Sequence, residues 1–211
     1  MTKSKYIVID GIDGGGKSTL FGSLEKRFIP YHQGSGNFIY TREPGGTPLG
    51  ETLRTLVLFE IMDPFTELCL FNAQRKEVRN MVKGFLEKGL HIISDRSDSA
   101  SFAYQIRGKE LDYLENDFWM LSKQLVPHPT MYIFLDLDPM IAEERRQIRE
   151  GGIKKGDRFE TQGVEFFQRV RNGFREFPTK VSVPCFFVNA EQEKGEVFKQ
   201  VSAHITNHLS E

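Results

Sequence analysis

Tyr6-Ile7-Val8-Ile9-Asp10-Gly11-Ile12-Asp13-Gly14-Gly15-Gly16-Lys17-Ser18-Thr19 is the stretch that decides the fold class. From Gly11 to Ser18 it matches the phosphate-binding pattern G-x-x-x-x-G-K-[ST]. An apolar, strand-forming run precedes the pattern, and residues 18–28 follow it with apolar side chains at helical spacing. That context is what the pattern requires. The stretch therefore predicts a strand, a glycine-rich loop and a helix, and with them a binding site for a nucleoside triphosphate.

The glycine-rich loop carries its own chemistry. Backbone N–H groups curl around phosphate oxygens, and the helix N-terminus adds partial positive charge. In this pattern Lys17 reaches the β- and γ-phosphates of ATP, and the Ser18 hydroxyl binds Mg²⁺. The expected ATP-binding residues are Gly11, Ile12, Asp13, Gly14, Gly15, Gly16, Lys17, Ser18 and Thr19.

Five apolar segments, at 6–9, 38–41, 91–94, 131–135 and 185–188, predict buried strands. Most lack polar alternation, which suits parallel strands that are covered on both faces. Helical stretches separate them, and one of these, 164–177, has apolar residues every three or four positions. We expect an α/β, three-layer fold of the P-loop NTPase type, with a five-stranded parallel sheet and helices on both faces. Ligands then bind at the carboxyl ends of the strands.

Composition limits the classes of function. A chain of 211 residues with 39% hydrophobic residues fits one domain, 1–211. The net charge of −1 gives no basic field that would favour nucleic acid or a membrane surface as partner. With no long apolar run, a cytoplasmic location is expected. Cys69 and Cys185 lie among apolar neighbours, and we expect both to be reduced and buried.

The segment from Arg149 to Arg158 is rich in glycine and basic residues and follows a helical stretch. These features favour a small mobile lid, at about residues 145–158, over a domain boundary. The arginines of this region alternate with glutamates, so a solvated, salt-bridged helix face is an alternative interpretation of any one of them.

Two further segments suggest a second phosphate site. Thr41-Arg42-Glu43-Pro44-Gly45-Gly46-Thr47-Pro48 predicts a tight, specially shaped loop, and Arg54 follows it. Arginines on either side of a rigid loop can hold a phosphate bidentately. The third predicted strand runs into Asp95-Arg96, where Asp95 could organise the Mg²⁺ shell and Arg96 could face phosphoryl charge.

Phe71 and Arg75 are four residues apart, on one face of a predicted helix. An aromatic ring and an arginine donor together suit a nucleobase pocket. Taken alone, the pair is more simply read as a core phenylalanine and a surface arginine.

Together these blocks resemble the thymidylate kinase family, whose members phosphorylate dTMP to dTDP with ATP. The resemblance rests on the phosphate loop, the Thr41–Glu51 block, Leu70-Phe71-Asn72-Ala73-Gln74-Arg75, Asp95-Arg96 with Ala103-Tyr104-Gln105, Leu135-Asp136-Leu137-Asp138-Pro139 and Asp157-Arg158-Phe159-Glu160. The blocks come in the family's order and cover most of the chain. Ser97 departs from the family, in which an aromatic residue often follows Asp-Arg.

The resemblance implies a role for each matching residue. Phe71 stacks on thymine, Arg75 donates to a base carbonyl, and Ser101 and Gln105 line the base. Tyr104 packs against the sugar, and Asp13 lies near the 3′-hydroxyl. The implied dTMP site is Asp13, Arg42, Pro44, Arg54, Phe71, Arg75, Arg96, Ser101, Tyr104 and Gln105. A cis Glu43–Pro44 peptide and a homodimer are also implied.

Catalysis in this family needs positioning and charge neutralisation more than covalent chemistry. The catalytic set that we predict is Lys17, Arg96, Arg149 and Asp13, with Mg²⁺ held by Ser18 and Asp95. Some family members place an arginine in the phosphate loop, but this loop has none, so the lid must supply it. Arg149 is the first candidate, with Arg145 and Arg146 behind it and Arg158 as the rival, which could instead anchor the lid through Asp157 or Glu160.

Two other functions remain open from the sequence. A related kinase could use another acceptor, such as a deoxynucleoside or a broader set of monophosphates. A phosphate-loop switch without catalysis is a different class, but it would need neither the acceptor-side arginines nor the Phe71 and Arg75 pair.

Overall fold

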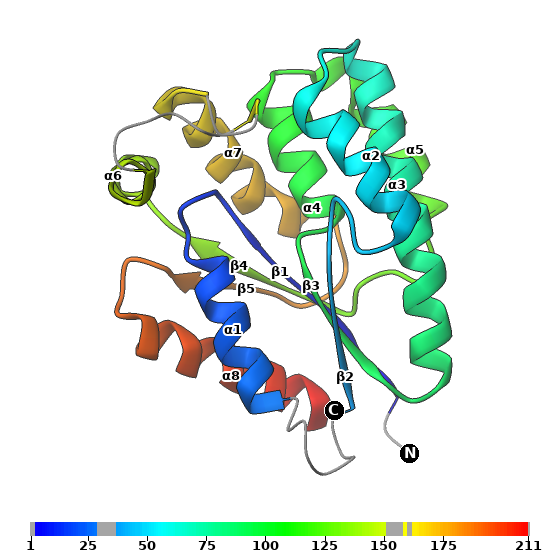
Figure 1. The fold of residues 1–211 in the computed structure, drawn as a ribbon, viewed down its shortest axis with the longest axis vertical. Helices are drawn as coiled ribbons and strands as arrows, with labels where there is room; N and C mark the ends of the chain where they lie inside the picture. The colour runs from blue at the N-terminus through cyan, green and yellow to red at the C-terminus, as the bar shows by residue number, and fades with distance from the viewer. Residues whose placement is uncertain (1–2, 29–36, 151–157, 160–161, 211) are drawn as a thin grey trace.

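Five parallel strands form the central sheet in the order β2-β3-β1-β4-β5 (Figure 1). They are β1 (Tyr6–Gly11), β2 (Phe38–Arg42), β3 (His91–Asp95), β4 (Met131–Asp136) and β5 (Cys185–Asn189). The structure, a computed structural model, describes residues 3–28, 37–150, 158–159 and 162–210, without the side chains of Arg149 and Glu150. The predicted five-stranded parallel sheet is confirmed.

Every strand extends one or two residues beyond its apolar run. In β1, Asp10 and Gly11 still pair with Phe134 and Leu135 of β4. Backbone pairing depends on the extended conformation and not on side-chain polarity, so it continues after the apolar pattern stops. The polar residues at these ends therefore belong to the sheet, which holds them in fixed positions.

The centre of the sheet is fully covered. The side chains of β1 from Tyr6 to Ile9 have no exposed surface. On the edge strand β5, in contrast, Phe187 is exposed. A strand buried on both faces needs the continuous apolar run that the sequence shows there.

Helices lie on both sides of the sheet (Figure 1). On one side α1 (Lys17–Phe28) packs against α8 (Lys194–Ser210). The other side carries α2 (Pro48–Phe59), α3 (Pro64–Glu87), α4 (Asp98–Ser101), α5 (Glu115–Lys123) and α7 (Val164–Glu176). The remaining elements are α6 (Pro139–Glu150), a π-helical segment (Phe102–Gly108) and two 3₁₀ turns (Asp112–Leu114 and Phe177–Thr179).

The π-helical segment packs closely against α7. A Cβ on Gly108 would lie 2.8 Å from atoms of Phe166 and Val170, and one on Gly173 would lie 2.9 Å from the Cα of Ala103. Glycines at both points allow the two backbones to approach each other. Short π-helical segments often mark functional sites, and this one carries Tyr104 and Gln105.

The two cysteines differ in part from expectation. Both are free thiols, as predicted, but each is only half-buried. Cys185 lies at the start of the edge strand β5, where one neighbouring strand is missing, so apolar sequence neighbours do not give full burial. Burial still raises the pKa of the Cys185 thiol to about 11.

Among the described residues, no helix combines the length and apolar character needed to cross a bilayer.

Candidate active site

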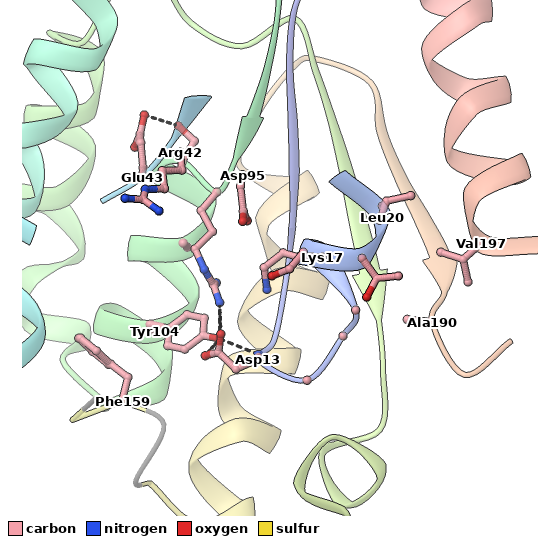
Figure 2. Close-up of a pocket in the computed structure, with 18 of the residues that line it drawn as sticks. Asp13, Lys17, Leu20, Arg42, Glu43, Asp95, Tyr104, Phe159, Ala190 and Val197 are labelled. Atoms are coloured by element: carbon pink, nitrogen blue, oxygen red, sulfur yellow. Dashed lines mark hydrogen bonds and ion pairs between the residues drawn. The ribbon is translucent and has the colours of Figure 1, made fainter. Parts of the chain in front are cut away.

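A cavity of about 1150 Å³ opens at the carboxyl ends of the strands (Figure 2). It exceeds the ~300–1,000 Å³ of a typical small-molecule pocket, so two ligands could occupy it side by side. The predicted residues that line it are Asp13, Gly14, Gly15, Gly16, Lys17, Ser18, Thr19, Arg42, Pro44, Arg54, Phe71, Arg75, Asp95, Arg96, Ser101, Tyr104 and Gln105. Gly11 and Ile12, the first two residues of the loop, are buried and are not among the lining residues.

The phosphate loop has the backbone conformation that its glycines allow. Gly11, Gly14 and Gly16 have φ of +142°, +85° and +83°. At Gly11 a Cβ would lie 2.5 Å from the carbonyl oxygen of Leu135, so a side chain cannot be placed there. The Lys17 ammonium donates to the carbonyl oxygens of Gly11 and Ile12, at 2.9 and 3.2 Å. Lys17 thus folds back along the loop at the position where phosphates bind.

Arg96 is bonded to the phosphate loop. It donates to Asp10 and to the carbonyl oxygen of Gly11, both at 3.2 Å, and to Asp13 at 2.5 Å. Its guanidinium also lies over the Tyr104 ring, 4.9 Å from the centroid. The backbone φ of Arg96 is +69°, a conformation that non-glycine residues adopt mainly where the surroundings impose it. The fold therefore fixes this arginine between the phosphate loop and Tyr104.

The pKa values of Asp10 and Asp13, the two carboxylates that pair with Arg96, are shifted in opposite directions. Burial raises the pKa of Asp10 to about 6, against the opposing charges of Arg96 and Lys17. Burial also acts on Asp13, but there the charges of Arg96 and Lys17 and a hydrogen bond from Tyr104 lower the pKa to about 2. Asp13 is therefore ionised at neutral pH and balances the charge of Arg96.

Ser18 and Asp95 are both on the cavity wall, as a magnesium site would require. The Asp95 Oδ1 atom is buried and has no hydrogen-bond partner among the described residues. A carboxylate oxygen without a donor suits a Mg²⁺ ion or one of its water ligands. Ser18 and Asp95 therefore fit a Mg²⁺ site.

The end of the cavity that carries Phe71 and Arg75 contains a buried ion pair. Arg75 is only 1% exposed, and its Nε donates to Glu43 at 2.6 Å. Its Nη atoms donate to Asn72, to the Ser97 carbonyl oxygen and to the Ser101 hydroxyl. These contacts occupy four of the five N–H groups of a guanidinium. The interpretation of Arg75 as a surface residue is wrong: α3 turns it inward, and Glu43 compensates its charge.

The loop after β2 carries Glu43 into this position. Its Glu43–Pro44 peptide is cis, as the family resemblance implies. Arg54 donates to the Pro44 carbonyl oxygen at 2.7 Å, and Arg42 pairs with Glu51 at 3.0 Å on the exposed side of the loop. Sequence reasoning included Glu43 only as part of the motif and missed it as the partner of Arg75. A buried arginine requires such a carboxylate. The signal that could have indicated burial is the spacing of Arg75 from Phe71 and Val78, four and three residues away on the same face of α3.

Ser97 lies behind this ion pair. It is fully buried, accepts a hydrogen bond from Arg79 at 2.9 Å, and donates to Glu43 at 3.4 Å. The departure from the family at this position thus places a hydroxyl in a buried polar network.

Aromatic rings line the same end of the cavity. Phe159 packs edge-on against Phe71, with ring centroids 6.1 Å apart, and against Tyr104, with centroids 6.0 Å apart; Figure 2 shows Phe159 beside Tyr104. Arg158, beside it, pairs with Glu67 of α3 and donates to the Val57 carbonyl oxygen at 2.8 Å. This end of the predicted lid is therefore anchored on α2 and α3, while Asp157 and Glu160 lie outside the described residues.

A further part of the wall was missed by the sequence analysis. After β5, the chain contributes Ala190, Gln192, Glu193, Lys194, Gly195, Val197 and Phe198 to the cavity, next to Leu20 of α1. The rule that ligands bind at the carboxyl ends of parallel strands could have indicated this segment. The segment mixes apolar residues with Gln192, Glu193 and Lys194, and it matches no motif that the sequence analysis used.

Besides Arg158, two arginines of the predicted lid are described with side chains. Arg145 donates to the Ala190 carbonyl oxygen at 2.9 Å, and the buried Arg146 pairs with Glu143; both line the cavity. A purely solvated face is therefore the wrong interpretation for these two. The Arg149 side chain lies outside the description.

The fold and the site together define a P-loop nucleotide kinase. The thymidylate kinase family model matches residues 9–201. A thymidylate kinase of Francisella tularensis subsp. novicida (strain U112) is 36% identical, over 99% of this chain and 98% of its own length. One from Albidiferax ferrireducens is 35% identical, over 95% and 94%. A crystal structure of thymidylate kinase from Ehrlichia chaffeensis superposes with a TM-score of 0.74 at 28% identity, covering 96% and 98%. The chain belongs to the thymidylate kinase family, whose reaction is ATP-dependent phosphorylation of dTMP to dTDP.

Proposed function

We propose that this protein transfers the γ-phosphoryl group of ATP to the phosphate of dTMP, and that the two nucleotides bind at opposite ends of the one cavity. The observation that carries the proposal is the buried Arg75–Glu43 pair on the same cavity as the phosphate loop. A phosphate loop alone serves many enzymes, whereas a buried, oriented arginine beside an aromatic ring suits recognition of a base.

In this proposal the base stacks on Phe71 and accepts a hydrogen bond at a carbonyl from the fifth N–H of Arg75. Ser101 and Gln105 line the base, and Tyr104 packs on the sugar. The acceptor phosphate binds among three arginines. Arg42 and Arg54 flank the loop after β2, and Arg96 follows β3. These cations lie on the cavity wall, which gives an acceptor oxygen a fixed, positively charged place.

On the donor side, the loop from Gly11 to Thr19 holds the phosphates of ATP, and Lys17 turns from its loop carbonyls to the β- and γ-phosphates. Ser18 and Asp95 would hold Mg²⁺, which would supply positive charge beside the transferred group. Arg149, on a lid at about residues 145–158, approaches the same phosphoryl group. Closure of this lid excludes water from the site.

Two wider features complete the proposal. We expect a homodimer, supported by a set of exposed apolar side chains on and between α2 and α3: Leu56, Phe59, Ile61 and Phe65. Such exposure is typical of an association surface. We also expect the enzyme to work in the cytoplasm, without nucleic acid or membrane partners.

An assay of ADP release with ATP and Mg²⁺ tests the acceptor. It should compare dTMP, dUMP, dCMP, dGMP, dAMP and thymidine as substrates. We expect turnover to favour dTMP strongly. Broad turnover, or turnover with thymidine alone, would retain the phosphate loop and reject the acceptor assignment. ATP binding without dTMP binding would favour a regulatory switch.

A further inference from the structure

Glu67 is a buried carboxylate next to the acceptor site that no sequence motif marks. It lies one helical turn before Phe71 on α3 and is 1% exposed. Its Oε1 accepts a hydrogen bond from the Gln105 amide nitrogen at 2.9 Å, and its Oε2 accepts one from Lys109 at 2.6 Å. Arg158 pairs with the same oxygen, Oε2. The two cations engage one carboxylate oxygen and leave the other to Gln105.

This contact fixes which way the Gln105 amide points. An ionised carboxylate can only accept hydrogen bonds, so the NH₂ group of Gln105, and not its oxygen, must face Glu67. Gln105 is only 2% exposed. Its side-chain oxygen Oε1 is buried and has no hydrogen-bond partner among the described residues. Buried polar atoms are normally satisfied, and an exception calls for an explanation.

The position of Gln105 supplies that explanation. Gln105 lines the cavity together with Phe71 and Arg75. We propose that Glu67 is a positioning residue that orients the Gln105 amide so that its oxygen accepts a hydrogen bond from the base of the acceptor nucleotide. This inference rests on the proposed function.

The resulting pair of groups has a definite polarity. Arg75 offers a donor, and Gln105 with its amide held by Glu67 offers an acceptor. Thymine and uracil present a carbonyl and a ring N–H on one edge, which match a donor and an acceptor. Cytosine presents an amino group and a bare ring nitrogen there, and it mismatches both. If the amide were reversed, the pocket would offer two donors, so Glu67 sets half of the selectivity.

The Glu67→Gln variant tests the proposal. A glutamine at 67 can donate as well as accept, so the amide of Gln105 is no longer held in one orientation. We expect the KM for dTMP to rise by about tenfold, the cost of leaving one buried hydrogen bond unmade. The kcat and the KM for ATP should change by less than about twofold, since no contact of the phosphate loop, where ATP is proposed to bind, is altered.

A reciprocal exchange separates orientation from simple structural support. In the double variant E67Q/Q105E, the carboxylate is at 105 and accepts from the amide at 67, which leaves its second oxygen for the base. We expect most of the lost affinity for dTMP to return. Failure of the exchange to improve on E67Q would overturn the proposal, as would a dTMP KM in E67Q close to that of the wild type.

Two additional variants keep the test decisive. Glu115→Gln is the matched control, because Glu115 also binds two cations, Arg107 and Lys180, but is not on the cavity wall; its dTMP KM should equal that of the wild type. If E67Q does not fold, Gln105→Leu removes the acceptor and leaves the cations on Glu67 in place. An unchanged dTMP KM in that variant would contradict the proposal. Lack of dTMP turnover in the wild type would reject the proposed function instead.

Discussion

The proposed acceptor half of the cavity, around Arg75 and Glu43, and the proposed donor half, at the phosphate loop, are organised differently. On the acceptor side, Arg75 and Glu43 are buried and already bonded to each other. On the donor side, Ser18 and Thr19 are exposed, and Lys17 is bonded to carbonyl groups of its own loop. The protein thus builds one half of the site as part of its core and leaves the other to be arranged by its ligand.

The difference indicates where selectivity and catalysis reside. Groups that are rigid before binding lose little entropy when the base arrives, so they favour selective recognition. Groups that move onto a triphosphate stabilise charge only when both substrates are present, which protects ATP from water. We expect substitutions in the acceptor half to affect stability and KM for dTMP, and substitutions in the donor half to affect kcat.

The largest effect should follow from the variant Glu43→Gln. It leaves the Arg75 charge buried without its counter-ion, so unfolding in denaturant should show a loss of about 3–5 kcal/mol. The KM for dTMP should rise as well, because Arg75 is then held less firmly. The control is Glu51→Gln in the adjacent helix α2, whose ion pair with Arg42 is exposed, at 44% and 56% for the two side chains; it should lose less than ~1 kcal/mol. Equal losses in the two variants would abolish the distinction between a buried and a surface pair.

The next effect tests the donor half. Arg149→Ala should lower kcat by about 10²–10³-fold, as expected when one charge-stabilising donor is removed. The KM for dTMP should stay near that of the wild type, because the acceptor half is intact. Arg175→Ala is the control, since Arg175 of α7 pairs with Asp136 of β4 and does not line the cavity. A normal kcat in the Arg149 variant would move the role to Arg145 or Arg158.

The smallest effect concerns Asp10, at the junction of the two halves. Its folded-state pKa of about 6 lies above its ordinary value near 4. The folded state therefore binds this proton more tightly, and the carboxyl contributes stability at low pH that is lost as the pH rises from about 4 to 6. The variant Asp10→Asn cannot ionise there. The stability of the wild type relative to this variant should fall across that window by about 1–3 kcal/mol, measured by denaturant unfolding at each pH. A difference that does not vary with pH would mean that Asp10 is not held at this raised pKa.

Local sequence patterns predicted the framework well. The five strands and α7 follow from runs and periods of apolar residues, and the phosphate loop follows from glycines that the observed positive φ values require. The boundaries of strands were less predictable. Asp95 and Asp136 still belong to strands because backbone pairing continues past the last apolar side chain.

The partners of the site residues could not be predicted in the same way. Glu43 and Arg75 are 32 positions apart, and Glu67 and Gln105 are 38 apart. The helical spacing of Arg75 from the apolar residues Phe71 and Val78 places it on the buried face of α3, but that period does not show which distant carboxylate pairs with it. The wall after β5 is similar, since Ala190 and Val197 carry no chemistry that a motif could mark.

The sequence by itself therefore determined the α/β class, the phosphate loop and, through its motif blocks, the family. Each of these depends on interactions between near neighbours in the chain, which leave a periodic or fixed-spacing pattern. Only the tertiary structure decided which charges are buried together, how Arg96 is held between Asp10 and Asp13, and which way the Gln105 amide points. Those features depend on contacts between distant segments, and their energies come from the burial that packing creates.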